Sequence, residues 1–189
     1  MNKLNSKQLR KSEPTELEIK NIKRNPIYLV LDRITDTYNV GSLFRLADAI
    51  AVKKVYLCGE MEYPPSSRIH KAAVGTENWV PWTTRSSAAL AVRELKNIGV
   101  QVIAVEQDKR AISYKDLKPV EKSLGFARDD KKGFTFPLAI IAGNETEGLP
   151  KEVLNEVDII VELPMFGINR SFNVWGSTAV IAYKILENL

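Results

Sequence analysis

The sequence predicts an α/β domain built on a mostly parallel β-sheet. Five short segments are continuously apolar instead of alternating between apolar and polar positions, which is typical of strands buried on both faces. Between them lie segments whose apolar residues recur at helical spacing. Strands alternating with helices favour a parallel sheet that helices cover on both sides. The 189 residues are enough for one domain with a full core.

The first half of the chain is expected to supply three strands and three helices. In order, these are strand 27–31, helix 40–51, strand 55–58, a short helix ending at residue 73, helix 86–97 and strand 100–105. Apolar residues from Leu43 to Ile50 indicate the first helix. Ser66 or Ser67 can cap the second helix, and Gly99 stops the third.

The second half begins with a weakly patterned stretch over 107–136, to which no element is assigned. The buried strand 137–142 then opens onto Gly143, and Pro150 suits the first turn of a short helix over 150–156. A last strand over 159–163 and a last helix over 174–187 complete the predicted body, which spans residues 26–189.

A basic arm, residues 1–25, precedes this body. It holds seven Lys or Arg residues and three Glu, whereas the rest of the chain has 20 basic and 20 acidic residues. We expect the arm to be partly helical from about Ser6 to Asn21, with an interruption near Pro14. A basic arm on a neutral body fits binding to the phosphates of nucleic acid. Terminal Lys and Arg residues can equally serve only to keep an end of the chain in solution.

Composition argues against several classes of protein. No apolar run approaches the roughly 20 residues that cross a bilayer, and the first residues lack the apolar core of a secretory signal. The only cysteine, Cys58, can form no intrachain disulfide and fits a reducing cytoplasm. With His70 as the only histidine, no zinc site is expected. We therefore expect a cytoplasmic protein without a metal, in which Cys58 is core and His70 is a surface residue.

Three polar segments carry the functional hypothesis, because each starts near the carboxyl end of a predicted strand, where parallel α/β sheets bind ligands. They are residues 39–45 (NVGSLFR), 143–150 (GNETEGLP) and 163–174 (LPMFGINRSFNV). No glycine-rich dinucleotide fingerprint follows a strand, and no NTPase phosphate-binding motif occurs. Dinucleotide-binding and P-loop proteins are therefore disfavoured.

Each segment also has a plainer structural interpretation. Asn39 can cap a helix whose residue Arg45 is solvated. Residues 143–148 can form a plain strand-to-helix turn in which Glu147 helps to cap the following helix. Ser171 and Asn173 are favoured at helix starts whatever the function. The convergence of all three segments on one edge of the sheet favours a shared ligand site over three unrelated turns.

In this order, the three segments resemble the motifs of the SpoU/TrmH branch of the SPOUT RNA methyltransferases, over about residues 25–189. The resemblance implies an α/β fold whose C-terminal segment is threaded into a deep trefoil knot, and a pocket for S-adenosylmethionine built from loops at strand ends. Phe172 and Trp175-Gly176 stand where the family usually has smaller or aliphatic residues. The cofactor-binding residues implied are Ala142, Gly143, Asn144, Leu163, Met165, Gly167, Phe172 and Asn173.

The same resemblance implies methyl transfer to a ribose 2′-hydroxyl of RNA. It also implies a homodimer, with the last helix and the first motif near the interface and an arginine entering each site from the partner. An arginine does not readily lose its proton, so we expect Arg45 to hold ribose or phosphate and to stabilise oxyanion charge. The alternative role of Arg45 as base stays open. The catalytic residues implied are Asn39, Arg45, Glu145, Ser171 and Asn173.

Only the basic arm precedes the body, and no separate RNA-binding domain does, which favours transfer RNA over ribosomal RNA as the substrate. A ribosomal RNA 2′-O-methyltransferase and an RNA-binding protein of the same fold without catalysis are the alternatives. The intact motif residues weigh against loss of catalysis. An α/β enzyme acting on a small molecule is a further alternative, against which the basic arm and the missing dinucleotide fingerprint weigh.

Overall fold

The computed structural model describes residues 13–120 and 133–189. Its strands are β1 (Ile27–Asp32), β2 (Lys54–Cys58), β3 (Trp82–Arg85), β4 (Gln101–Val105), β5 (Ile112–Ser113), β6 (Lys118–Pro119), β7 (Gly133–Phe134), β8 (Leu138–Ala142) and β9 (Ile159–Glu162). Its helices are α2 (Glu16–Lys20), α3 (Thr37–Ala49), α4 (Ser67–Ala73), α5 (Ala88–Asn97), α6 (Lys151–Glu156) and α7 (Val174–Leu186), with 3-10 turns at Thr76–Asn78 and Tyr114–Asp116. The main sheet is parallel throughout, in the order β3-β2-β1-β8-β4-β9-β5, and β6 pairs with β7 beside it.

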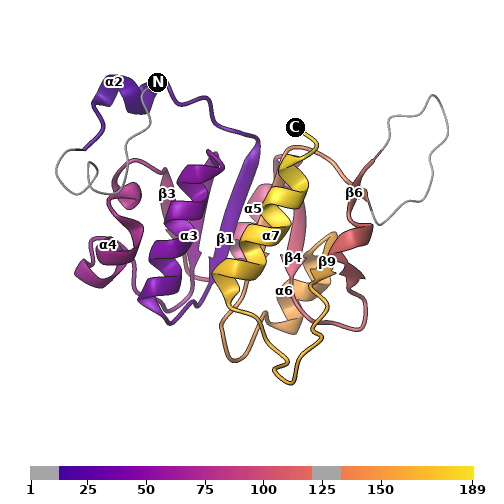
Figure 1. Ribbon diagram of the computed structural model, residues 1–189. Helices are drawn as coiled ribbons and strands as arrows, with labels where there is room; N and C mark the ends of the chain where they lie inside the picture. The colour runs from indigo at the N-terminus through magenta and orange to yellow at the C-terminus, as the bar shows by residue number, and fades with distance from the viewer. Residues whose placement is uncertain (1–12, 121–132) are drawn as a thin grey trace.

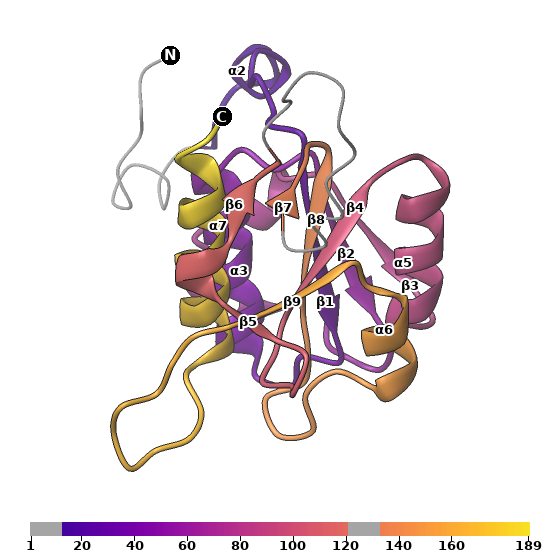
Figure 2. The same cartoon turned by 90° about the vertical axis from the view of Figure 1, so that its right-hand side faces the viewer.

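Helices cover both faces of this sheet, as the sequence predicts. Helices α3, α4 and α7 lie on one face and α5 and α6 on the other (Figures 1 and 2). Alternate residues of β1 face the two layers: Leu29 and Leu31 pack with α3 and α7, whereas Tyr28 and Val30 pack with α5. Burying each such aliphatic side chain contributes about 1.5–3 kcal/mol, so a strand apolar on both faces stabilises both layers.

The five predicted strands are confirmed, with bounds within two residues of those expected. Sequence patterning missed β3, an edge strand in which three residues are partly buried and one is exposed, and the short elements between β4 and β8. The prediction for α3 was wrong at its start. The helix begins at Thr37, because the side chain of Asp36 accepts a hydrogen bond from Tyr38 N and caps it. Asn39 therefore lies inside the helix, not before it.

The chain just before β1 is fixed to the body. Arg24 donates from its guanidinium to the carbonyl oxygens of Val52 and Trp79, at 3.1 and 2.9 Å. Helix α2 carries a capping box between Thr15 and Glu18. The rest of the helix expected from Ser6 lies largely outside the described residues. Within the described part of the chain, no helix is both long enough and apolar enough to cross a bilayer.

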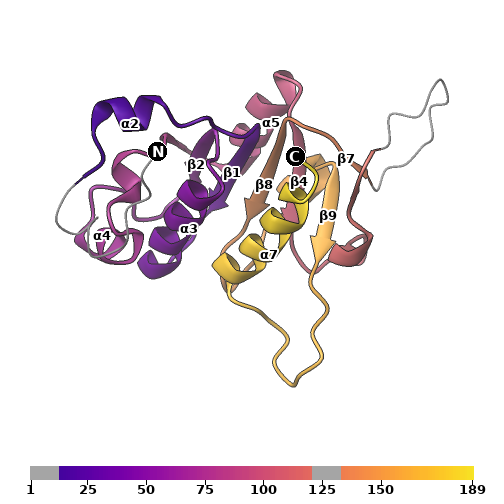
Figure 3. The same cartoon turned by 45° about the horizontal axis from the view of Figure 1, so that its top comes forward.

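The order in which strands are added to the sheet changes sides at β1, and this change determines where a ligand can bind. From β1 the chain builds outward through β2 and β3, then crosses to β4, and β8 fills the gap between β1 and β4. Such a reversal leaves a crevice at the carboxyl ends of the strands. Helices α3 and α7 lie side by side over the strands, and the segment joining β9 to α7 extends beyond the sheet at that edge (Figure 3).

Candidate active site

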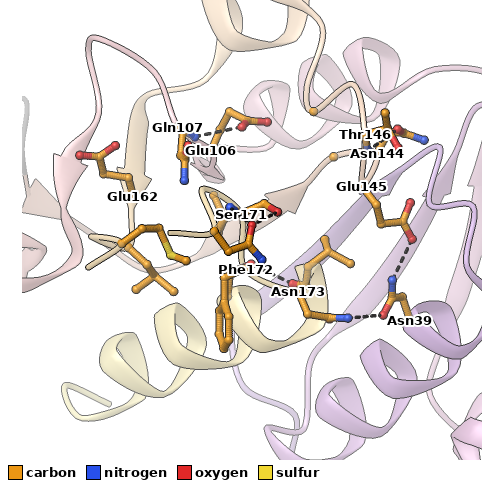
Figure 4. A pocket seen from close by; sticks show the side chains of 18 of the residues that line it. Asn39, Glu106, Gln107, Asn144, Glu145, Thr146, Glu162, Ser171, Phe172 and Asn173 are labelled. Carbon is orange, nitrogen blue, oxygen red and sulfur yellow. Dashed lines mark hydrogen bonds between the residues drawn. The ribbon is translucent and has the colours of Figure 1, made fainter. Parts of the chain in front are cut away.

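A cavity of about 530 Å³ lies beyond the carboxyl ends of β1, β8, β4 and β9 (Figure 4). The strand register explains why four loops meet there. Leu31 pairs with Ala142, Ala142 with Val105, and Val105 with Val161, so the residues that follow leave the sheet at one level. The sequence-predicted residues that line the cavity are Asn39, Gly143, Asn144, Glu145, Leu163, Met165, Ser171, Phe172 and Asn173.

Three predicted site residues do not line this cavity. Ala142 is buried within β8. Gly167 lies in open space, with no atom within 4 Å of the position a Cβ would take. Arg45 is exposed on α3 and, among the described residues, makes no hydrogen bond or ion pair within the chain. This exposed position agrees with the plainer interpretation, in which Arg45 is a solvated residue of the helix.

A hydrogen-bonded chain joins one residue from each of the three segments (Figure 4). Asn173 Nδ2 donates to Asn39 Oδ1 at 3.0 Å, and Asn39 Nδ2 donates to Glu145 Oε1 at 2.9 Å. The groups at both ends of this row of hydrogen bonds determine which atom donates and which accepts. The oxygen of Asn173 accepts from the backbone N–H of Trp175, and a carboxylate can only accept. The two amides can therefore each point only one way.

Glu145 is the anchor of this chain. Besides Asn39, its carboxylate accepts hydrogen bonds from the backbone N–H groups of Thr35 and Asp36 and from the Thr35 hydroxyl, at 2.9–3.1 Å. Burial alone would raise the pKa of Glu145, but these donors outweigh it and hold its pKa below the ordinary value. The carboxylate is consequently charged at neutral pH and ties the loop after β8 to the start of α3.

The rest of the second segment is also held firmly. Asn144 donates to the carbonyl of Arg33 and accepts from the N–H groups of Thr146 and Glu147. Arg33 pairs with Glu147 at 2.5 Å and with Asp32 at 3.1 Å. Glu147 of this segment thus pairs with Arg33 and not with Arg45.

The glycine that opens this segment serves the loop itself. A Cβ on Gly143 would lie 2.6 Å from the carbonyl carbon of Gly148 and 2.7 Å from the nitrogen of Leu149. The loop folds back over its own first residue, and Asn144 pairs with Gly148. The need for glycine is therefore explained by close approach within the protein, without a ligand passing over it.

The third segment is held far more loosely. Phe166 and Ile168 are 89% and 101% exposed. Among the described residues, the Ser171 hydroxyl makes one hydrogen bond, to Asn169 of the same loop. Gln107 Nε2 donates to the carbonyl of Arg170 at 2.6 Å. Asn173 ends the segment as the N-cap of α7, as expected. The Asn173 side chain caps the helix with its oxygen and donates a hydrogen bond to Asn39 with its nitrogen.

The two departures from the family pattern compensate each other. A Cβ on Gly176 would lie 2.9 Å from the ring of Phe172. The large ring at 172 therefore fits because residue 176, one turn into α7, has no side chain. Phe172 and Gly176 together therefore fill the space beside the first turn of α7 with one large ring.

Sequence reasoning missed several lining residues at or shortly after the carboxyl ends of strands. Thr35 and Asp36 follow β1, Glu106 and Gln107 follow β4, and Glu162 ends β9. Their position after an apolar run was the available signal. Together with Glu145, the acidic residues give the cavity lining four carboxylates, and no Lys or Arg of the described chain lines it.

Cys58 and His70 both lie away from the cavity. Burial raises the pKa of the Cys58 thiol to about 12, so Cys58 is inert core, as expected. The His70 ring is 61% exposed and contacts Glu77, which agrees with a surface position. No cluster of His, Cys, Asp and Glu suited to a metal occurs among the described residues.

Comparison with known proteins agrees with the geometry. The model of the SpoU rRNA Methylase family matches residues 26–183. The chain is 28% identical to a 23S rRNA (guanosine-2′-O-)-methyltransferase of Neisseria meningitidis over 86% of its own length and 59% of the relative's. It is 27% identical to the tRNA (guanosine(18)-2′-O)-methyltransferase of Escherichia coli, over 86% of this chain and 64% of that one.

Solved structures give the same result. The AdoMet-bound rRNA methyltransferase of Sinorhizobium meliloti matches with a TM-score of 0.72 and 26% identity, over 96% of this chain and 60% of that one. The chain thus spans about 60% of the length of the rRNA methyltransferases from Neisseria meningitidis and Sinorhizobium meliloti that it matches. The match to the family model covers nearly the whole predicted body, including all three segments around the cavity. This chain therefore belongs to the SpoU rRNA Methylase family.

Proposed function

We propose that this protein transfers a methyl group from S-adenosylmethionine to a ribose 2′-hydroxyl of RNA. The observation that carries the proposal is the chain Asn173–Asn39–Glu145, which draws the three motif segments together beside one cavity. The names of the relatives, which are RNA 2′-O-methyltransferases, support the same activity.

The charge and the apolar surface of the cavity lining suit S-adenosylmethionine. The cofactor carries a positive sulfonium and a positive amino group, and the lining offers Asp36, Glu106, Glu145 and Glu162 without a described cation. Leu163, Met165 and Phe172 add apolar surface for a purine ring, and Gly143 and Asn144 offer backbone groups. When bound, the cofactor supplies an activated methyl group at its sulfonium sulfur.

The residues of the chain would then align the reacting atoms. Methyl transfer forms a bond from the 2′-oxygen to carbon and breaks one from carbon to sulfur, while the hydroxyl gives up its proton. Holding oxygen, carbon and sulfur in line accounts for much of the acceleration in such a step. We assign this alignment to Asn39, Glu145, Ser171 and Asn173. A protonated Arg45 would hold the ribose or phosphate and stabilise negative charge on oxygen.

Arg45 can take this part only if a second copy supplies it, because it does not line the cavity of its own chain. The exposed apolar residues of α7, Trp175 (43%) and Tyr183 (53%), support a homodimer that buries them, as do Phe166 and Ile168. Helix α3, which carries Arg45, packs beside α7. An interface over α7 would bring the partner's α3 near the cavity.

The trefoil knot is part of the proposal. It is supported by the way the segment between β4 and β8 packs against the last helix. Leu117 and Phe134 share one core cluster with Ile181 and Ile185 of α7. An experimental structure that traces residues 163–189 outside the loop formed by residues 106–137 would contradict the knot.

For the substrate, we favour transfer RNA and keep ribosomal RNA as the alternative, since relatives of both kinds match. The cytoplasm is the compartment where either RNA would be met. The test is methyl transfer from radiolabelled S-adenosylmethionine to total transfer RNA and ribosomal RNA, each from a strain lacking this gene. Label in one pool, at a nucleotide resistant to alkaline cleavage, would support the proposal and name the substrate. Cofactor binding without label in either pool would favour an RNA-binding protein without catalysis.

Mixing two inactive variants tests the shared site. Arg45→Ala is expected to abolish methyl transfer while leaving cofactor affinity nearly unchanged, and Asn173→Ala to damage both activity and the cofactor loop. In a mixed dimer, one site would contain neither change. Co-refolding equal amounts should then restore about a quarter of wild-type activity, because half of the dimers are mixed and each has one intact site. If both variants are inactive and mixing restores nothing, Arg45 acts in the site of its own chain. An Arg45→Ala protein that keeps its activity would place Arg45 outside catalysis.

A further inference from the structure

Two residues outside the three motifs hold the loops after β8 and β9, which we call the two cofactor loops because both line the proposed S-adenosylmethionine cavity. Glu106 and Gln107 follow directly on β4, which lies between β8 and β9 in the sheet. The backbone N–H of Glu106 donates to the carbonyl of Val161, so the start of this pair is fixed to β9. Both side chains line the cavity (Figure 4).

Glu106 holds the loop after β8. One carboxylate oxygen accepts from the backbone N–H of Leu149 at 2.8 Å, and the other accepts from the N–H of Gln107 at 2.9 Å. The contact is close: Gly148 has a φ of +66°, and a Cβ there would lie 2.5 Å from the carboxylate. The loop after β8 is thus built around this carboxylate.

Gln107 holds the loop after β9. Its Nε2 donates to the carbonyl of Arg170 at 2.6 Å, near the middle of an exposed segment. The other side-chain hydrogen bonds of residues 163–173, within the described chain, run inside the loop or at its end, from Ser171 to Asn169 and from Asn173 to Asn39. Gln107 is therefore the tether of the exposed part.

We propose that Glu106 and Gln107 are positioning residues that clamp the two cofactor loops against β4 and set the width of the cavity between them. This inference rests on the proposed function, since it assumes that the cavity takes S-adenosylmethionine. A ligand that closes on an untethered loop must supply the entropy lost when the loop is ordered, and a tether in the free protein reduces that cost. The clamp is expected to act on cofactor binding and hardly on the chemical step.

The test compares Gln107→Glu and Gln107→Ala with a control at the other end of the same strand. Gln107→Glu keeps the length of the side chain and replaces the donor by an acceptor that faces a carbonyl. Gln101 holds another loop in the same manner, donating to the carbonyl of Gly133 at 3.1 Å and accepting from Thr135 N at 2.7 Å. Gln101→Ala therefore removes a similar tether far from the cavity.

Two measurements are made on each full-length variant. Calorimetry gives the Kd for S-adenosylmethionine, and mass spectrometry gives the rate of tryptic cleavage at the Arg170–Ser171 bond in the free protein. Both Gln107 variants should bind the cofactor about 3- to 10-fold more weakly, the loss expected for one net hydrogen bond. They should be cut faster at Arg170 and keep the kcat of the wild type at saturating cofactor. Gln101→Ala should match the wild type in both measurements.

Glu106→Gln gives a second route to the same answer. The amide keeps the shape of the carboxylate but turns one acceptor into a donor, which opposes the N–H of Leu149 or of Gln107. Because Glu106 also supplies one of the carboxylates of the lining, Glu162→Gln is the control for loss of charge alone. Glu106→Gln should lose more affinity than Glu162→Gln, with normal folding by circular dichroism, and an equal loss would show that only the charge matters.

The outcomes separate the clamp from the proposed function. Wild-type protein that binds no S-adenosylmethionine would overturn the proposed function, and the clamp with it as a cofactor device. If the wild type binds the cofactor but the Gln107 variants bind equally well, the positioning role is wrong even when cleavage at Arg170 is faster. A Gln101→Ala protein that loses affinity as much as Gln107→Ala would likewise overturn it, because the effect would then be general loosening.

Discussion

The loop after β8 and the loop after β9 line the same cavity, yet they are held in different ways. In the first, residues 143–149, the side chains of Asn144, Glu145 and Glu147 all make hydrogen bonds to the chain around β1. In the second, residues 163–173, the side chains of Phe166 and Ile168 are exposed. One hydrogen bond, from Asn173 to Asn39, joins the end of the second loop to the first motif.

This difference suggests a division of tasks. The half of the site around Asn39 and Glu145 is set before any ligand arrives, which is the condition for electrostatic stabilisation without reorganisation. The half around residues 163–173 exposes apolar side chains, and such surface is stabilised when a ligand or a second copy covers it. Mutations in the two halves should accordingly report on different quantities: stability in the first, binding in the second.

The largest effect is expected from the glycine of the first motif. A Cβ on Gly41 would lie 2.6 Å from the carbonyl oxygen of Ile69 and 2.6 Å from the Cβ of Ala72. Alanine normally favours a helix by about 1 kcal/mol over glycine, but α3 and α4 would have to separate. We expect Gly41→Ala to lower the free energy of unfolding by about 2–3 kcal/mol, measured by urea denaturation. A neutral result would mean that α4 moves freely against α3.

The next effect concerns the anchor of the fixed half. Glu145→Gln keeps the shape of the side chain but cannot accept from every donor that now points at the carboxylate. We expect a loss of roughly 1–3 kcal/mol in unfolding free energy at pH 7. Folding lowers the pKa of Glu145 below its ordinary value of 4.5. The charged carboxylate therefore contributes to the free energy of unfolding above pH 4.5, and this contribution is lost as the pH falls through the lowered pKa.

The difference in stability between Glu145→Gln and the wild type should therefore shrink as the pH is lowered from about 5 to about 3. Chemical denaturation of both proteins across this range measures it. A difference that stays constant would show that the charge of Glu145 is not what holds the loop, and that shape alone is.

The sequence predicted the frame of this site better than its contacts. Apolar runs and helical spacing located the strands that end at the cavity, because burial on both faces is a local property of the sequence. The residues of the second segment, 143–150, could be named from the sequence, but the role of Gly143 could not. Position 143 requires glycine because it contacts Gly148, five residues later.

Contacts between distant segments escaped prediction for the same reason. Nothing near Arg33 in the sequence indicates that it pairs with Glu147, more than one hundred residues away. The clamp at Glu106 and Gln107 was missed because it follows a strand without any motif of its own. The start of α3 was missed by three residues because the Asp36 cap precedes the apolar pattern.

A smaller effect should measure the link between the two halves. Asn39→Ala and Asn173→Ala each remove one side of the 3.0 Å hydrogen bond, and each also loses a second contact, to Glu145 or to Trp175 N. A double-mutant cycle of unfolding free energies separates the shared bond from these. We expect a coupling of about 0.5–1.5 kcal/mol between the two changes. A coupling near zero would mean that the third segment folds independently of the first.

The smallest effect should come from the glycine of the third segment, the counterpart of Gly41. A Cβ on Gly167 meets nothing within 4 Å, and no positive φ strains it. Gly167→Ala should change the free energy of unfolding by no more than about 0.5 kcal/mol, since only the entropy of the unfolded chain is altered. Gly41→Ala, measured beside it, shows what the same added methyl group does in the fixed half.

The affinity of Gly167→Ala for S-adenosylmethionine extends this comparison to the bound state. The family resemblance implies that Gly167 contacts the cofactor, whereas in the structure it lies outside the cavity. If the loop keeps this position when ligand binds, calorimetry should give an unchanged Kd. A clear loss of affinity at unchanged stability would instead mean that residues 163–173 fold inward over the cofactor, and that the exposed half of the site is completed by its ligand.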